Sequence, residues 1–169
     1  ALLRGELLPL GATADRWFWL GLSGVIGLAL GDALLFQAFV VVGPRLSMLI
    51  MALAPILAAV LAWAALGEGL VAADLIGIGL ALSGVALVIS EPRRGGGTDL
   101  GALSTRDFAV GLLLALGGAA GQATGLVTSK LGLLGDYSAL SANLIRMLAA
   151  TAVMWTVAGL RGEARSGVT

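Results

Sequence analysis

The residues of this chain that could do chemistry are a few polar side chains inside long apolar stretches. Asp32 is the clearest of them, because it lies within an otherwise apolar segment. An ionised acid at the centre of a membrane helix costs about 2.5–3.5 kcal/mol on insertion scales, which the surrounding Leu, Ile, Val and Phe residues offset. Asp32 should therefore face the protein interior or a wet cavity. There it would bind a solute or carry a proton; otherwise it is tied to a neighbouring helix or is protonated.

Four other polar residues inside the apolar segments are candidates. Arg146 is about two turns into its own segment. It could extend its charged end to the membrane surface, pair with Asp32 or another acid, or bind an anionic group. The side-chain amides of Gln37, Gln122 and Asn143 could hydrogen-bond a solute or bridge helices, and bridging is the more frequent use.

The composition argues against several other kinds of site. The sequence has no His and no Cys, which removes disulfides, thiolate and imidazole metal ligands, and Ser–His or Cys nucleophiles. Ten basic residues balance ten acidic ones, so no charge excess favours nucleic acid. We therefore expect no catalytic residue, no metal and no cofactor. An intramembrane enzyme would need two carboxylates that converge in one pocket, and the intramembrane acids do not pair at positions i and i+4.

The apolar segments that carry these residues are long enough to cross a membrane. Hydrophobic residues make up 59% of the chain and charged residues 12%, where globular domains carry roughly 25% charged residues. The mean hydropathy is +1.01. A span of ~30 Å of hydrocarbon takes roughly 20 residues in a helix. Segments of about this length predict helices at 17–42, 46–67, 72–90, 108–129 and 138–160.

The segment 46–67 indicates lipid rather than a soluble core around these helices. It has no polar stripe at any helical angle, and a helix that is apolar all round needs lipid or a very large protein core. No ten-residue segment alternates polar and apolar residues as a membrane barrel would. The predicted fold class is all-α, a polytopic bundle of transmembrane helices with five spans in this chain.

Two sequence features predict how the helices bend and pack. Pro55 removes a backbone hydrogen bond within the segment 46–67, so it would act either as a hinge or as a static kink. Small residues at a spacing of four predict close approach of helix backbones. They form the ridges Ser23/Gly27/Gly31, Gly77/Ala81 and Gly117/Gly121/Gly125.

An ordered set of short motifs resembles a known repeat. The first half contains Gly31-Asp-Ala-Leu-Leu-Phe-Gln-Ala-Phe39, Gly43-Pro-Arg-Leu-Ser47, Ala54-Pro55, Leu66-Gly-Glu68, Gly77 and Gly84-Val85. In this order and spacing they resemble the second part of an EamA-type repeat, which defines a branch of the drug/metabolite transporter superfamily. The stretch from Gly111 to Lys130, followed by Leu131-Gly-Leu and Asn143-Leu-Ile-Arg146, resembles the opening of a following repeat.

The resemblance implies a division of the chain. Residues 1–90 would be the C-terminal part of one repeat, 91–107 a linker, and 108–169 the N-terminal part of the next. Such transporters have ten helices in two inverted five-helix repeats, so this chain would hold helices three to seven. We expect it to be a piece of a longer protein that does not transport alone.

The function that the resemblance implies is secondary transport. We expect an exporter of small metabolites or amino-acid-like solutes that works by alternating access in the inner (plasma) membrane of a bacterium. Its partners would be the lipid bilayer and a small-molecule solute, with a homodimer left open and no nucleic acid. Pro55 would be the hinge. The substrate path would contain the five polar residues named above, which are Asp32, Gln37, Gln122, Asn143 and Arg146. The alternative is a membrane scaffold or assembly subunit that does not transport.

Overall fold

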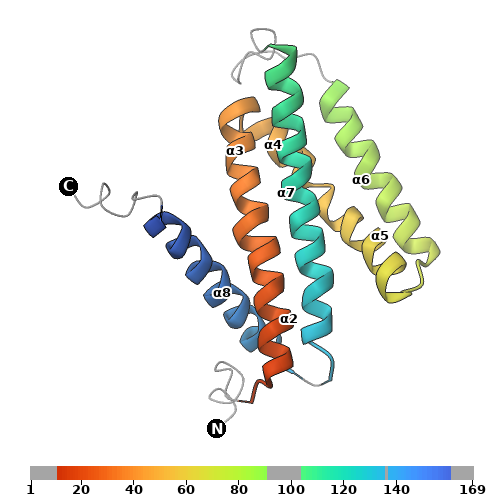
Figure 1. Ribbon diagram of the computed structural model, residues 1–169. Coiled ribbons are helices and arrows are strands. Elements are labelled where there is room, and N and C mark those ends of the chain that lie inside the picture. The colour runs from red at the N-terminus through yellow and green to blue at the C-terminus, as the bar shows by residue number, and fades with distance from the viewer. Residues whose placement is uncertain (1–10, 91–103, 136, 161–169) are drawn as a thin grey trace. The chain divides into compact units, whose positions relative to one another are not determined.

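Every secondary-structure element in the described part of the chain is a helix. The computed structural model describes residues 11–90, 104–135 and 137–160, and no strand occurs among them (Figure 1). The predicted all-α fold class is confirmed. The predicted linker 91–107 lies largely outside the described residues. The elements are α2 (Ala14–Gly24), the π-helix η1 (Val25–Gly31), α3 (Asp32–Val42), α4 (Pro44–Met51), α5 (Ala54–Leu66), α6 (Ala72–Ser90), α7 (Thr105–Gly132) and α8 (Ala139–Leu160).

Four helical stretches are long and apolar enough to cross a membrane. They are Ala14–Val42, Pro44–Leu66, Thr105–Gly132 and Ala139–Leu160, of 29, 23, 28 and 22 residues. The fifth predicted span corresponds to α6, of which the part Ala72–Leu87 counts as a shorter apolar helix. The prediction of a polytopic helical membrane protein therefore holds, with four spans that meet the length criterion among the described residues.

The predicted helix 17–42 is present, but its hydrogen-bonding pattern changes in the middle. The helix begins at Ala14, and η1 occupies Val25–Gly31 between α2 and α3. A π-helix bonds residue i to residue i+5 instead of i+4 and is rare, because it widens the turn. The backbone continues through this segment without a break, since Gly31 has φ −60° and ψ −47°. The π segment ends directly before Asp32.

The predicted continuous helix 46–67 is wrong in one respect, because the structure divides it into α4 and α5. Pro55 lies in the first turn of α5, immediately after the break. Proline has no backbone N–H, and its ring clashes with the carbonyl four residues earlier. The chain tightens there, since Leu53 N donates to the Ile50 carbonyl at 2.9 Å. Pro55 thus begins a new helix instead of kinking a continuous one.

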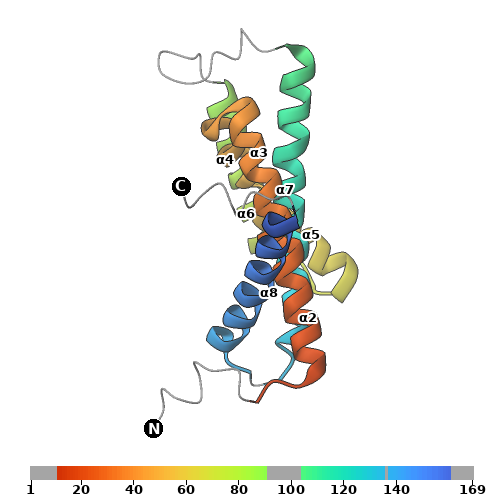
Figure 2. The same ribbon diagram turned by 60° about the vertical axis from the view of Figure 1, so that its left-hand side comes forward.

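The chain divides into two compact units. The first unit comprises Ala1–Leu30 and Thr124–Thr169, and the second comprises Gly31–Ala123. In the first unit α2 packs against α8 (Figure 2), around a core of Leu20, Ala142 and Ile145. In the second unit α3 packs against α4, and the core consists of Ala38, Ile50 and Ala115.

Glycines allow the helix backbones to approach closely inside each unit. In the second unit, a Cβ added at Gly31 would lie 3.5 Å from the Gly121 carbonyl carbon. In the first unit, a Cβ added at Gly125 would lie 2.7 Å from the Gly27 Cα. These contacts confirm two of the predicted ridges. The third is not confirmed, because a Cβ at Gly77 in α6 would meet nothing within 4 Å.

Candidate functional site

The candidate site of the second unit begins with the position of Asp32. This residue is the first of α3 and directly follows η1, and its side chain is half-buried. Val42 ends the helix ten residues later, which is ~15 Å at 1.5 Å per residue. Half of a hydrocarbon core of ~30 Å is the same distance. The carboxyl group therefore belongs near the midplane of the span.

The partner of Asp32 is an amide on α7. Gln122 Nε2 donates a hydrogen bond to Asp32 Oδ1 at 2.7 Å, in a partly buried position. Glycines make this contact feasible, because the two backbones have no side chains between them: a Cβ at Gly31 would lie 3.2 Å from the backbone N of Gln122. Gln122 thus bridges two helices, and Asp32 is tied to a neighbouring helix. The place of both residues in a substrate path stays a prediction.

The bonded pair retains unused hydrogen-bonding capacity. A carboxylate offers about four acceptor positions, and the contact with Gln122 Nε2 uses one of them. The Gln122 Oε1 is a further acceptor. Among the described residues of its own unit, Asp32 forms no ion pair. A site rich in acceptors and without a fixed cation suits a proton, a cationic group or a hydrogen-bond donor.

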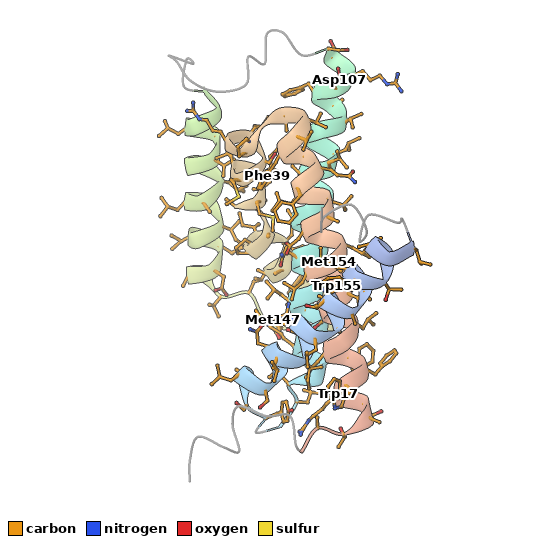
Figure 3. The ribbon with its side chains drawn as sticks, turned by 90° about the vertical axis from the view of Figure 1, so that its left-hand side faces the viewer. Trp17, Phe39, Asp107, Met147, Met154 and Trp155 are labelled. Carbon is orange, nitrogen blue, oxygen red and sulfur yellow. The ribbon has the colours of Figure 1, made fainter. Side chains whose placement is uncertain are left out.

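The other two predicted amides form no bridge between helices in the described part of the chain. Gln37 is exposed on α3, and the five residues that separate it from Asp32 turn it by ~140° around the helix. Asn143 is exposed on α8, with its Nδ2 3.9 Å from Met147 Sδ one turn further along. Figure 3 labels Met147 on that helix. Their place in a substrate path stays a prediction.

Arg146 lies on α8 in the first unit and is half-buried. Its Nε is fully buried and has no hydrogen-bond acceptor. Among the described residues of its own unit it forms no ion pair, and pairing with Asp32 stays a prediction. Its backbone is in close contact with α2, since a Cβ added at Gly24 would lie 2.8 Å from the Arg146 Cα.

Pro55 is exposed at the start of α5. The break before it separates two helices that each keep their own hydrogen bonds, as Leu57 N donates to the Leu53 carbonyl at 2.9 Å. A break of this kind is compatible with a hinge and with a fixed bend. The role of Pro55 as a hinge stays a prediction.

A polar contact that the sequence analysis missed joins the start of α2 to the turn between α7 and α8. Arg16 Nη2 donates to the Leu134 carbonyl at 3.1 Å, and its guanidinium carbon lies 4.6 Å from the centre of the Tyr137 ring. The signal was an arginine and a tyrosine just outside two predicted helices. It became visible only once α2 and α8 were known to be neighbours, and it stabilises the end of the first unit rather than a site.

Comparison with known proteins gives one match. The model of the EamA-like transporter family matches residues 1–90. Neither the curated proteins nor the solved structures contain a match to this chain.

Proposed function

The chain belongs to the EamA-like transporter family, and on this premise we propose that it works in a secondary transporter that exports small metabolites or amino-acid-like solutes by alternating access. Family membership supports a membrane transporter, and the apolar helices support an integral membrane protein. The direction of transport, the solute class and the mechanism are the proposal. So are the bacterial inner membrane and the place of this chain as helices three to seven of ten.

The observation that carries the proposal is the hydrogen bond from Gln122 to Asp32 near the middle of two membrane spans. Acidic residues inside membrane segments are costly and usually functional. Substrate and coupling-ion sites of secondary transporters lie near the midplane, where helices depart from regular geometry. Here η1 ends directly before Asp32, and π-helical turns are frequent at functional sites.

The proposed mechanism assigns separate tasks to the two side chains. The Gln122 amide holds Oδ1 of Asp32 and so fixes the orientation of the carboxyl group. The other carboxyl oxygen accepts a proton or a hydrogen bond from the solute. Neutralisation of the charge weakens the charge-assisted bond to Gln122, because such bonds are roughly twice as strong as neutral ones. Occupancy of the site would thereby loosen α3 from α7 and favour the switch between the two access states, with Pro55 as the flexible point of the other span.

The test is flux of a mixed metabolite panel through vesicles that contain the full-length protein. Asp32→Asn keeps a carbonyl oxygen for the Gln122 amide but removes the charged carboxylate. The matched control is Asp107→Asn, an exposed acid in the first turn of α7. The proposal expects loss of flux in Asp32→Asn and unchanged flux in the control. Flux that survives in Asp32→Asn would leave a transporter in which Asp32 only packs.

A scaffold or assembly subunit that does not transport is the second candidate. The observation that favours it is that Asp32 already has a protein partner and that glycines bring the helix backbones together. Both features would also serve helix association alone. Absence of flux for every solute by the wild-type protein would decide for this candidate.

A further inference from the structure

The guanidinium group of Arg146 is a charge inside a predicted membrane span, and the described residues of its own unit do not neutralise it. Arg146 is the eighth residue of the 22-residue helix α8, so its Cα lies ~10 Å from the start of the helix. Burial of its Nε without an acceptor is costly, because the N–H loses its hydrogen bonds to water and gains none in the protein. Such a group is expected to have an anionic partner.

The described residues of the first unit supply no such partner. In this part of the chain Asp15 is the one acid, and it is exposed in the first turn of α2. Gly24, where α2 contacts Arg146, is nine residues further along, a distance of ~13 Å. Asp15 is therefore too far along the helix for an ion pair. The nearby cation Arg16 contacts the Leu134 carbonyl and the Tyr137 ring.

The backbone of α8 holds Arg146 at a fixed place. A Cβ added at Gly24 would lie 2.8 Å from both the Cα and the carbonyl carbon of Arg146, so no larger residue fits there without separation of the helices. The neighbouring residue Ile145 is fully buried in the core of the unit. The guanidinium is thus attached to a rigid element, which lowers the entropy lost when it binds a ligand.

We propose that Arg146 is an oxyanion-binding residue whose ligand is the carboxylate of a transported solute or the phosphate of a lipid headgroup. The planar guanidinium matches both groups, since each presents oxygens that accept two parallel N–H bonds. The solute source rests on the proposed transport function. The lipid source does not, because a headgroup can reach an arginine near a helix end whether or not anything is transported.

The solute source is tested by flux of an amino acid from the panel beside its carboxamide, which has the same side chain but no carboxylate. The full-length protein in phosphatidylcholine vesicles should prefer the amino acid. Arg146→Gln should reduce this preference, measured as the ratio of the two KM values, about 10- to 150-fold, the equivalent of one hydrogen bond to a charged group. Arg45→Gln is the matched control, because Arg45 is exposed at the start of α4 and should leave the ratio unchanged.

The lipid source is tested by the thermal stability of the detergent-purified protein, which needs no flux. Phosphatidylglycerol should raise the Tm of the wild type and of Arg45→Gln more than a diacylglycerol without phosphate does. Arg146→Gln should lose this difference if a headgroup binds Arg146, and should keep it if the ligand is the solute. If the glutamine variant does not fold, Arg146→Leu takes its place, since leucine inserts readily into membranes.

The two measurements separate failure of this inference from failure of the proposed function. A wild type without flux would refute transport. The lipid-dependent Tm shift would then decide whether Arg146 binds a headgroup phosphate. A variant that matches the wild type in both the KM ratio and the lipid-dependent Tm shift would refute the oxyanion site, whatever the protein transports.

Discussion

The hydrogen bond between Gln122 and Asp32 predicts a measurable coupling between two membrane helices. Its length of 2.7 Å is in the range of charge-assisted bonds. Hydrogen bonds to charged groups contribute about 1.5–3 kcal/mol in soluble proteins, whereas side-chain hydrogen bonds in a membrane protein average about 0.6 and reach about 1.7 kcal/mol. Because the bond is short and only partly buried, we expect a coupling of about 1–1.7 kcal/mol.

The assay is a double-mutant cycle on the free energy of unfolding in mixed detergent and lipid. It compares the wild type, Asp32→Ala, Gln122→Ala and the double variant. A second cycle starts from Asp32→Asn, which keeps the acceptor but removes the charge. There the coupling should fall to roughly half, since neutral hydrogen bonds are about half as strong. Gln37→Ala is the control partner, because Gln37 is exposed; its effect should add to that of Asp32→Ala within ~0.5 kcal/mol.

Two results would contradict this reasoning. Additive effects of Asp32→Ala and Gln122→Ala would mean that the bond does not form in lipid. Equal coupling for aspartate and asparagine would mean that the carboxyl group is already neutral in the folded state. Neutralisation of this group could then not drive the proposed switch.

Three further predictions concern packing, and thermal or chemical unfolding of the variants checks each of them. Gly125→Ala should destabilise the protein by about 1–3 kcal/mol, because its Cβ would meet the backbone of η1. Gly77→Ala, with nothing within 4 Å of its Cβ, should not destabilise the protein and should raise its stability by up to about 1 kcal/mol, because alanine is the better helix former. Equal effects of the two substitutions would contradict the two contact patterns. Gly67→Ala should cost about 1–2 kcal/mol, because Gly67 ends α5 with φ +67°; a neutral effect would show that this helix end has another conformation. Arg16→Leu should cost about 1 kcal/mol through loss of its contacts with Leu134 and Tyr137, and no loss would mean that these exposed contacts contribute nothing.

The spans of this fold follow from hydropathy for a simple physical reason. In lipid every backbone polar group must bond within its own helix, so an apolar segment long enough to cross has one available structure. The segment 72–90 was predicted with the bounds that the structure gives to α6. Predicted and observed ends of the segment 108–129 differ by three residues, since α7 runs from Thr105 to Gly132. The helix extends beyond the apolar segment because polar residues such as Arg106, Asp107 and Lys130 continue the backbone hydrogen bonds, whereas the hydropathy falls where they begin.

Hydropathy carried no information on the local hydrogen-bond pattern inside a span. It counts apolar residues, and a π-turn such as η1 contains the same residues as an α-turn. The division of the segment 46–67 was partly predictable, because Pro55 marks the place where a backbone hydrogen bond of the helix is lost. Its outcome depended on the preceding turn: the Leu53 N–H bonds to Ile50 in a tighter turn, which ends α4 before the proline. Tertiary packing decides whether a proline kinks a helix or ends it, and this packing cannot be derived from a single sequence.

The pairing of Asp32 with Gln122 was less predictable than the spans and more predictable than the π-helix η1. The residues are 90 positions apart, so neither local spacing nor hydropathy links them. The small-residue ridges do contain the link, because Gly31 directly precedes Asp32 and Gly121 directly precedes Gln122. When two such ridges face each other, the residues next to the glycines lie at the rim of the contact and can reach across it. A Cβ at Gly31 would lie 3.5 Å from the Gly121 carbonyl carbon, which shows that these two ridges do face each other. A polar residue beside a ridge glycine is therefore a better guide to a polar contact between helices than a polar residue alone, and by this criterion Gln37, which follows Phe36, is the weaker candidate for such a contact.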